Sequence, residues 1–187
     1  GTDGVTLESG KWAEVLEASG HKCFWLAGEL DKDSDKGILI EKAHFRHAQN
    51  VWINEQVFGR KRRNAAVTDL IHELRASLKS RLYEFIERFE LDLLIAENVL
   101  SIPMHIPLAL ALTEVVAETQ LPTIAHHHDF FWERQQFMTN AAWEYLNMAF
   151  PPHLPSIPGP STRSAPRARV RRCMRSGAAR ADGSVPG

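Results

Sequence analysis

Two short apolar segments with a helical segment between them restrict the fold of this 187-residue chain more than any other feature. Residues 91–96 and residues 121–126 are both apolar runs with the length of a buried strand. Residues 102–120 between them favour a helix. Pro103 is compatible with it, because proline is tolerated in a first helical turn. This order predicts two parallel strands joined by a right-handed crossover.

The same alternation of strand and helix patterns extends over the rest of the chain. Helical periodicity covers residues 5–16, 64–89 and 131–150, and the strongest pattern is that of residues 64–89. Apolar runs at residues 21–27 and 38–40 predict two further strands, and no other element is predicted between the second run and the long helix. The predicted fold class is α/β, with a Rossmann-like parallel sheet and flanking helices.

The chain divides into a body, residues 1–157, and a tail, residues 158–187. The body begins on a glycine-bearing loop that should follow a strand, so we expect the first strand of the domain to be missing. Six prolines fall within sixteen positions from Pro151, and no Leu, Ile, Phe, Trp or Tyr follows Ile157. Such a tail cannot bury enough apolar surface to offset its ordering entropy and is predicted to be disordered. It is either a native basic arm or an out-of-frame reading of GC-rich DNA.

Charge and cysteine content exclude several classes of protein. Seven arginines and one aspartate give residues 158–187 a charge of +6, and the net charge of −1 therefore leaves −7 for residues 1–157. Non-specific nucleic-acid binding by an acidic body is not expected. Two isolated cysteines form neither a disulfide framework nor a zinc pattern. Polar residues and prolines interrupt the longest apolar region, Val99 to Val116, so no membrane span is predicted and the expected location is the cytoplasm.

Three groups of polar residues are predicted to meet where the parallel strands end. One group is a glycine loop that consists of Gly1, Thr2, Asp3 and Gly4. Its glycines would let backbone N–H groups approach an oxyanion at the start of a helix. A second group, Glu97 and Asn98, offers a hydrogen-bond acceptor and a donor to substrate hydroxyls, or alternatively caps the next helix.

The third group is the segment from His126 to Asp129. His128 is the candidate hydrogen-bond partner or proton carrier, and Asp129 is expected to hold its tautomer. His126 and His128 would share one side of an extended strand, an arrangement that also occurs in zinc sites. The sequence does not reveal a third ligand, and no metal is assigned. Together the three groups fit a sugar or a phosphorylated polyol.

These motifs carry a family resemblance. The stretch from Gly1 to Val5, with a helix and a strand after it, looks like the start of retaining glycosyltransferases of the GT-B type. Residues 92–98, residues 102–111 and residues 122–130 resemble the same N-terminal, acceptor-side domain in the family-four, sucrose-synthase-like group. The likeness covers roughly the whole body of the chain.

The resemblance implies a function and assigns roles to residues. It implies transfer of a sugar from a nucleotide-sugar donor to a small sugar or polyol acceptor with retention of configuration, without a further cofactor or an obligatory metal. His128 and Asp129 would lie beside the reacting sugar, and the glycine loop from Gly1 to Gly4 near the donor phosphates and the acceptor. The family's second Rossmann domain, which binds the nucleotide-sugar, has no counterpart here, so we expect no transferase activity from this chain alone.

Two alternatives to a glycosyltransferase fragment stay open at this point. The body could be a free-standing Rossmann-like module that binds a sugar phosphate. It could also be a metal-dependent hydrolase that uses the His126–Asp129 cluster.

Overall fold

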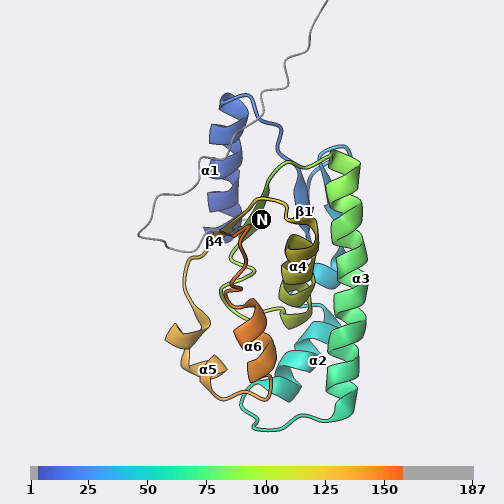
Figure 1. The fold of residues 1–187 in the computed structure, drawn as a ribbon, viewed down its shortest axis with the longest axis vertical. Coiled ribbons are helices and arrows are strands. Elements are labelled where there is room, and N and C mark those ends of the chain that lie inside the picture. Colours follow the sequence, from blue (N-terminus) through green and yellow to red (C-terminus); the bar gives the residue numbers. More distant parts are fainter. Residues whose placement is uncertain (1–3, 158–187) are drawn as a thin grey trace, which may run out of the picture.

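The structure is a computed structural model, and it describes residues 4–157 (Figure 1). The strands are β1 (Trp25–Ala27), β2 (Gly37–Leu39), β3 (Leu94–Glu97) and β4 (Thr123–His126). The helices are α1 (Gly4–Ala18), α2 (Ala48–Val57), α3 (Ala65–Phe89), α4 (Ile106–Thr119), α5 (Gln135–Met138) and α6 (Trp143–Ala149), with short 3₁₀ turns η1 (Glu41–Ala43) and η2 (Phe131–Glu133). The predicted mixture of helices and strands is confirmed.

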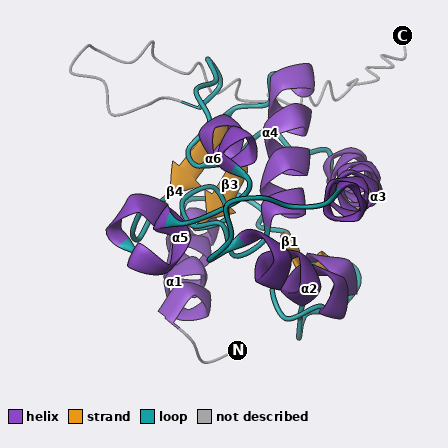
Figure 2. Ribbon diagram, turned by 90° about the horizontal axis from the view of Figure 1, so that it is seen from below, coloured by secondary structure: helices purple, strands orange, loops and turns teal. Residues whose placement is uncertain are grey.

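The four strands form two separate parallel pairs. In one pair β1 lies beside β2, with Leu26 opposite Ile38. In the other pair β3 lies beside β4, with Ile95 opposite Ile124. The predicted parallel pairing is confirmed, but no strand ladder among the described residues joins the pairs into the single sheet that we expected (Figure 2).

The core is built around the packing of α3 against α4. The Asn64 side chain caps the start of α3 by accepting a 3.0 Å hydrogen bond from the Val67 N–H. One face of α3 is buried in the core. Its buried residues recur every three or four positions and are Val67, Ile71, Leu74, Leu78, Leu82 and Phe85. In both views α4 lies between α3 and α6 and is therefore covered on opposite sides (Figures 1 and 2).

Two predicted features of the helices are wrong. Residues 48–57 form α2, which the sequence did not reveal. The single helix predicted for residues 131–150 is divided into η2, α5 and α6. The reason lies in backbone bonds to the end of α2: the Thr139 carbonyl accepts from Gly59 N–H at 2.8 Å, and the Ala141 N–H donates to the Val57 carbonyl at 3.0 Å. These long-range bonds replace the helical bonds that a continuous helix would make.

Several predictions fall on parts of the chain outside the described residues. The predicted disorder of residues 158–187 is one of them, and the placement of Gly1, Thr2 and Asp3 is another. Among residues 4–157, no helix is both long enough and apolar enough to cross a membrane.

Candidate functional site

The site lies where β3 and β4 end side by side. In-register parallel pairing places Glu97, the last residue of β3, opposite His126, the last residue of β4. Asn98 follows with a left-handed backbone, φ 57°, and its N–H donates to the His126 carbonyl at 2.8 Å. The predicted convergence of these two polar groups at the strand ends is therefore present.

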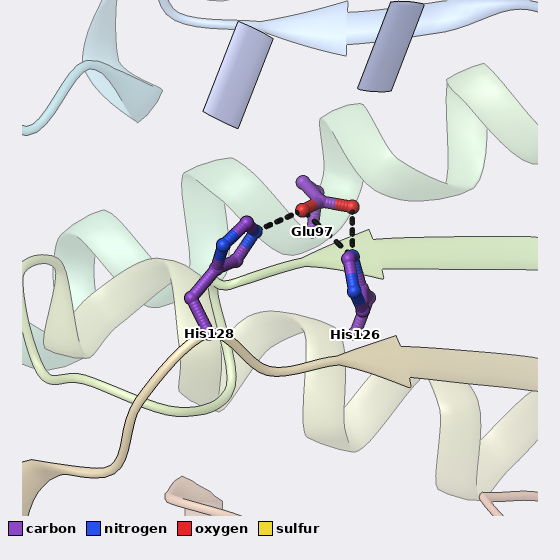
Figure 3. A group of neighbouring side chains, drawn as sticks. All are labelled: Glu97, His126 and His128. Carbon is purple, nitrogen blue, oxygen red and sulfur yellow. Dashed lines mark hydrogen bonds and ion pairs between the residues drawn. The ribbon is translucent and has the colours of Figure 1, made fainter. Parts of the chain in front are cut away.

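The Glu97 carboxylate lies between two imidazole rings (Figure 3). Nδ1 of His126 is 2.9 Å from both carboxylate oxygens, and Nε2 of His128 is 2.6 Å from Oε1. The Glu97 side chain is only 14% exposed, whereas those of His126 and His128 are 29% and 34% exposed. No lysine or arginine within residues 4–157 forms an ion pair with this carboxylate, so its charge is met by imidazoles alone.

Asn98 connects the two loops that follow the strands. Its Oδ1 accepts from the backbone N–H of His128 at 3.3 Å, and its carbonyl accepts from the Ser101 hydroxyl at 2.9 Å. The Ser101 carbonyl in turn accepts from the Phe131 N–H at 3.1 Å. The Asn98 side chain therefore fixes the backbone that carries His128, a role beyond the hydroxyl binding that we predicted for it.

The partner of Asp129 differs from the one that we expected. Its Oδ2 forms an ion pair with Nε of Arg134, and its Oδ1 is buried without a hydrogen bond among the described residues. The carboxylate in contact with His128 is that of Glu97. The physical reason is the 3₁₀ turn η2, which follows Asp129 and brings the guanidinium of Arg134, the residue after η2, back to the Asp129 carboxylate.

His127 differs from the two histidines beside it. Its ring packs against Phe130, with ring centroids 5.2 Å apart, and its Nδ1 is buried without a hydrogen-bond partner within residues 4–157. Burial lowers the pKa of His127, and the neighbouring His126 lowers it further. The ring is therefore a neutral packing group, and the alternation along the chain places His126 and His128 together on the other side.

Helix α1 also reaches the site. Gly4, the last member of the predicted glycine loop, is the first residue of α1 and is exposed. The Trp12 ring meets the His126 ring edge-on, with centroids 5.6 Å apart. The sequence predicted a helix over residues 5–16, which include Trp12, but did not reveal this contact or the roles of Ser101 and Arg134. No local pattern marks these residues, because each contact depends on the tertiary fold.

Known proteins related to the chain are glycosyltransferases. The chain is 29% identical over 160 residues to mannosylglucosylglycerate synthase of Thermotoga maritima, a match that covers 83% of this chain and 36% of that protein. It is 25% identical over 166 residues to the protein of the same name from Petrotoga mobilis, with 82% of this chain and 35% of that protein covered. The chain thus spans about a third of the length of these relatives.

Two other comparisons gave no match. No protein-family model matches the sequence, and no solved structure matches it. The predicted resemblance to glycosyltransferases is confirmed by the two relatives, while the GT-B type and the family-four group are finer assignments than these matches support.

Proposed function

We propose that the chain is the acceptor-side portion of a retaining GT-B glycosyltransferase of the family-four group, acting in the cytoplasm. The observation that carries the proposal is similarity over more than four-fifths of the chain to two synthases whose product is a glycosylated glycerate. The paired strands and the polar groups at their ends support it, because parallel α/β sheets bind ligands at the carboxyl ends of their strands. The donor nucleotide would be bound by a second Rossmann-like domain.

The residues at the strand ends can bind and orient a sugar acceptor. The Glu97 carboxylate accepts hydrogen bonds from hydroxyls, and the ring of His128 can exchange its bond to Glu97 for one to a substrate oxygen. Nδ2 of Asn98 makes no hydrogen bond within the described residues, so it can donate to a second oxygen. These three groups in one place fix the orientation of a polyol, which is what transfer to one selected hydroxyl requires.

The names of the relatives define the substrates to test. We propose that the acceptor is glucosylglycerate or a similar glycoside of a small hydroxy acid, and that the donor is mannose activated as a nucleoside diphosphate. His128 would lie next to the transferred sugar, with Asp129 at the edge of the site. Gly1 to Gly4 would contribute backbone N–H groups to the donor phosphates.

Titration calorimetry of the 187-residue chain with glucosylglycerate tests the proposal. We expect saturable binding that His128→Ala and Glu97→Gln weaken by roughly tenfold or more, since each removes a hydrogen bond to a buried polar partner. His127→Ala is the matched control and should bind like the wild type, because its ring faces away from Glu97. Absence of saturable binding to glucosylglycerate and to glycerate would overturn the assignment.

A second measurement addresses the activity of the chain by itself. Incubation with mannose nucleotides and glucosylglycerate should give no glycosylated product, because these 187 residues match only about a third of the length of their relatives and we place the donor site in the remainder. Product formation by the purified chain would show that one domain contains both substrate sites, and the two-domain assignment would then be wrong.

A further inference from the structure

We propose that Glu97, His126 and His128 form a binding site for one divalent transition-metal ion, with Zn²⁺ as the first ion to test. A carboxylate oxygen and one nitrogen from each ring all lie within 4.8 Å of one another. The three side chains converge from the end of β3, the end of β4 and the loop after β4 (Figure 3). This inference departs from the expectation of no metal, which rested on the lack of a third ligand in the sequence and on family resemblance, and it does not depend on the proposed glycosyltransferase function.

The ligand set suits zinc chemically. Two imidazoles and one carboxylate are the three protein ligands of one common class of catalytic zinc site, in which the fourth position is open. A tetrahedral ion at about 2.0–2.1 Å from each ligand needs ligand atoms roughly 3.4 Å apart. The present separations are 2.9 Å to His126 and 2.6 Å to His128, and all three ligand atoms lie within 4.8 Å of one another, so side-chain shifts on the order of 1 Å bring them to this spacing.

The charge of the site favours a cation. The Glu97 carboxylate is mostly buried, and no lysine or arginine of the described residues neutralises it. Taking a carboxylate out of water is costly unless an opposite charge lies nearby. A divalent ion would compensate the carboxylate fully and leave one positive charge at the open position. That position would accept water or an anionic or hydroxyl oxygen.

Binding also requires a change of tautomer in each ring. His126 Nδ1 and His128 Nε2 now face the carboxylate as hydrogen-bond donors. When these nitrogens bind the metal, the proton of each neutral ring resides on its other nitrogen. Both rings are about a third exposed, so that nitrogen can be solvated.

The backbone holds the three ligands in place before any ion arrives. The β3–β4 register fixes Glu97 opposite His126, and the hydrogen bond from His128 N–H to Asn98 Oδ1 fixes the loop that carries the third ligand. Preorganised ligands on strand ends lose little conformational entropy on metal binding. The sequence alone indicated only the two histidines, because Glu97 lies 29 residues earlier and the sheet register brings it to them.

Metal titration of the full chain tests the site directly. The untagged protein, with Cys23 and Cys173 replaced by serine, is stripped with a chelator and titrated with Zn²⁺ against a chromophoric competitor and with Co²⁺ as a spectroscopic probe. We expect one ion per chain and d–d absorption typical of a four- or five-coordinate site. Glu97→Gln, His126→Ala and His128→Ala should each weaken binding by roughly tenfold or more.

Matched controls separate this site from adventitious binding. His127→Ala leaves the cluster intact and should retain wild-type affinity, although it lies between two of the proposed ligands. Glu97→Gln preserves side-chain shape, so circular dichroism should show that its weaker binding is not a folding defect. The absence of saturable binding, or equal binding by all four variants, would overturn the proposal. Since no sugar enters this experiment, its failure is distinguishable from failure of the proposed transferase function.

Discussion

The unit formed by β3, α4 and β4 and the helix α1 are packed very differently, although both contribute to the candidate site. Helix α4 buries nine of its fourteen residues, whereas α1 buries none of its fifteen. Leu7 and Val15 of α1 are 58% and 65% exposed, while Leu110 of α4 is 1% exposed. Glu97 and His126 therefore lie on a firmly packed support, and a lightly held helix contacts the His126 ring.

The largest expected effect on stability comes from truncating one leucine in each of these two regions. Leu110 in α4 is only 1% exposed, so Leu110→Ala should lower the free energy of unfolding by about 3–4 kcal/mol through lost burial and a cavity. Leu7→Ala in α1 should change it by less than about 0.5 kcal/mol, since the side chain is already in water. Urea unfolding followed by circular dichroism measures both. Similar losses for the two variants would show that α1 is packed as firmly as the core.

His105 connects the start of α4 to η1 and gives a pH-dependent test of the firmly packed region. Its Nε2–H donates to the Lys42 carbonyl of η1 at 2.8 Å, and its Nδ1 caps α4 by accepting from Leu108 N–H at 3.2 Å. Burial lowers the pKa of His105 from 6.5 to about 4. Because the unfolded chain takes up this proton at higher pH than the folded one, the His105 contribution is intact above pH 6.5 and is lost as pH falls towards 4.

The expected loss from His105 is about 3 kcal/mol across that pH range. His105→Asn keeps a capping side chain without a titrating group, so its stability should fall less steeply with acid than that of the wild type. Urea unfolding at several pH values between 4 and 7 measures the difference. Parallel pH curves for the two proteins would show that His105 is protonated in the folded state as readily as in the unfolded chain.

Substitutions of Asn98 test how firmly the ends of β3 and β4 are held. Asn98→Ala should cost about 2 kcal/mol, because it removes the bond to His128 N–H and places an alanine at φ 57°. Asn98→Gly removes the same bond but relieves the backbone strain, so it should cost only about 1 kcal/mol. The difference between the two variants in urea unfolding isolates the strain. Equal costs would mean that the left-handed backbone contributes nothing.

The fold was predictable where local pattern and tertiary packing agree. The expected helix over residues 64–89 matches α3 to within one residue, because its inward positions recur every three or four residues. Helix α2 was not predictable, since its buried face includes Asn50, whose Nδ2 donates to the carbonyls of Phe45 and Met104 at 2.8 Å each. A polar residue in the core weakens the apolar periodicity on which the prediction of a helix depends.

The site was predictable in its location but not in its pairings. Strand ends carrying Glu97 and His128 were expected to meet, and the parallel register brings them together. Because the two residues are adjacent in the sequence, we expected Asp129 to hold the tautomer of His128. The structure instead pairs Asp129 with Arg134 and His128 with Glu97. Neighbouring residues on an extended segment face opposite directions, so adjacency in sequence is a poor guide to side-chain contact there.

The last prediction concerns the ring contact between Trp12 of α1 and His126 of the site. Trp12→Ala removes the edge-on contact with His126 but should lower stability by less than about 1 kcal/mol, because α1 has no buried residue. The same substitution should shift the NMR signal of the His126 ring, while the signal of His72, which contacts Tyr145, stays unchanged as the control. A shift without a loss of stability means that α1 covers the site without supporting it. A large loss of stability, or no shift of His126, would contradict the contrast between the helix and the β3–α4–β4 unit.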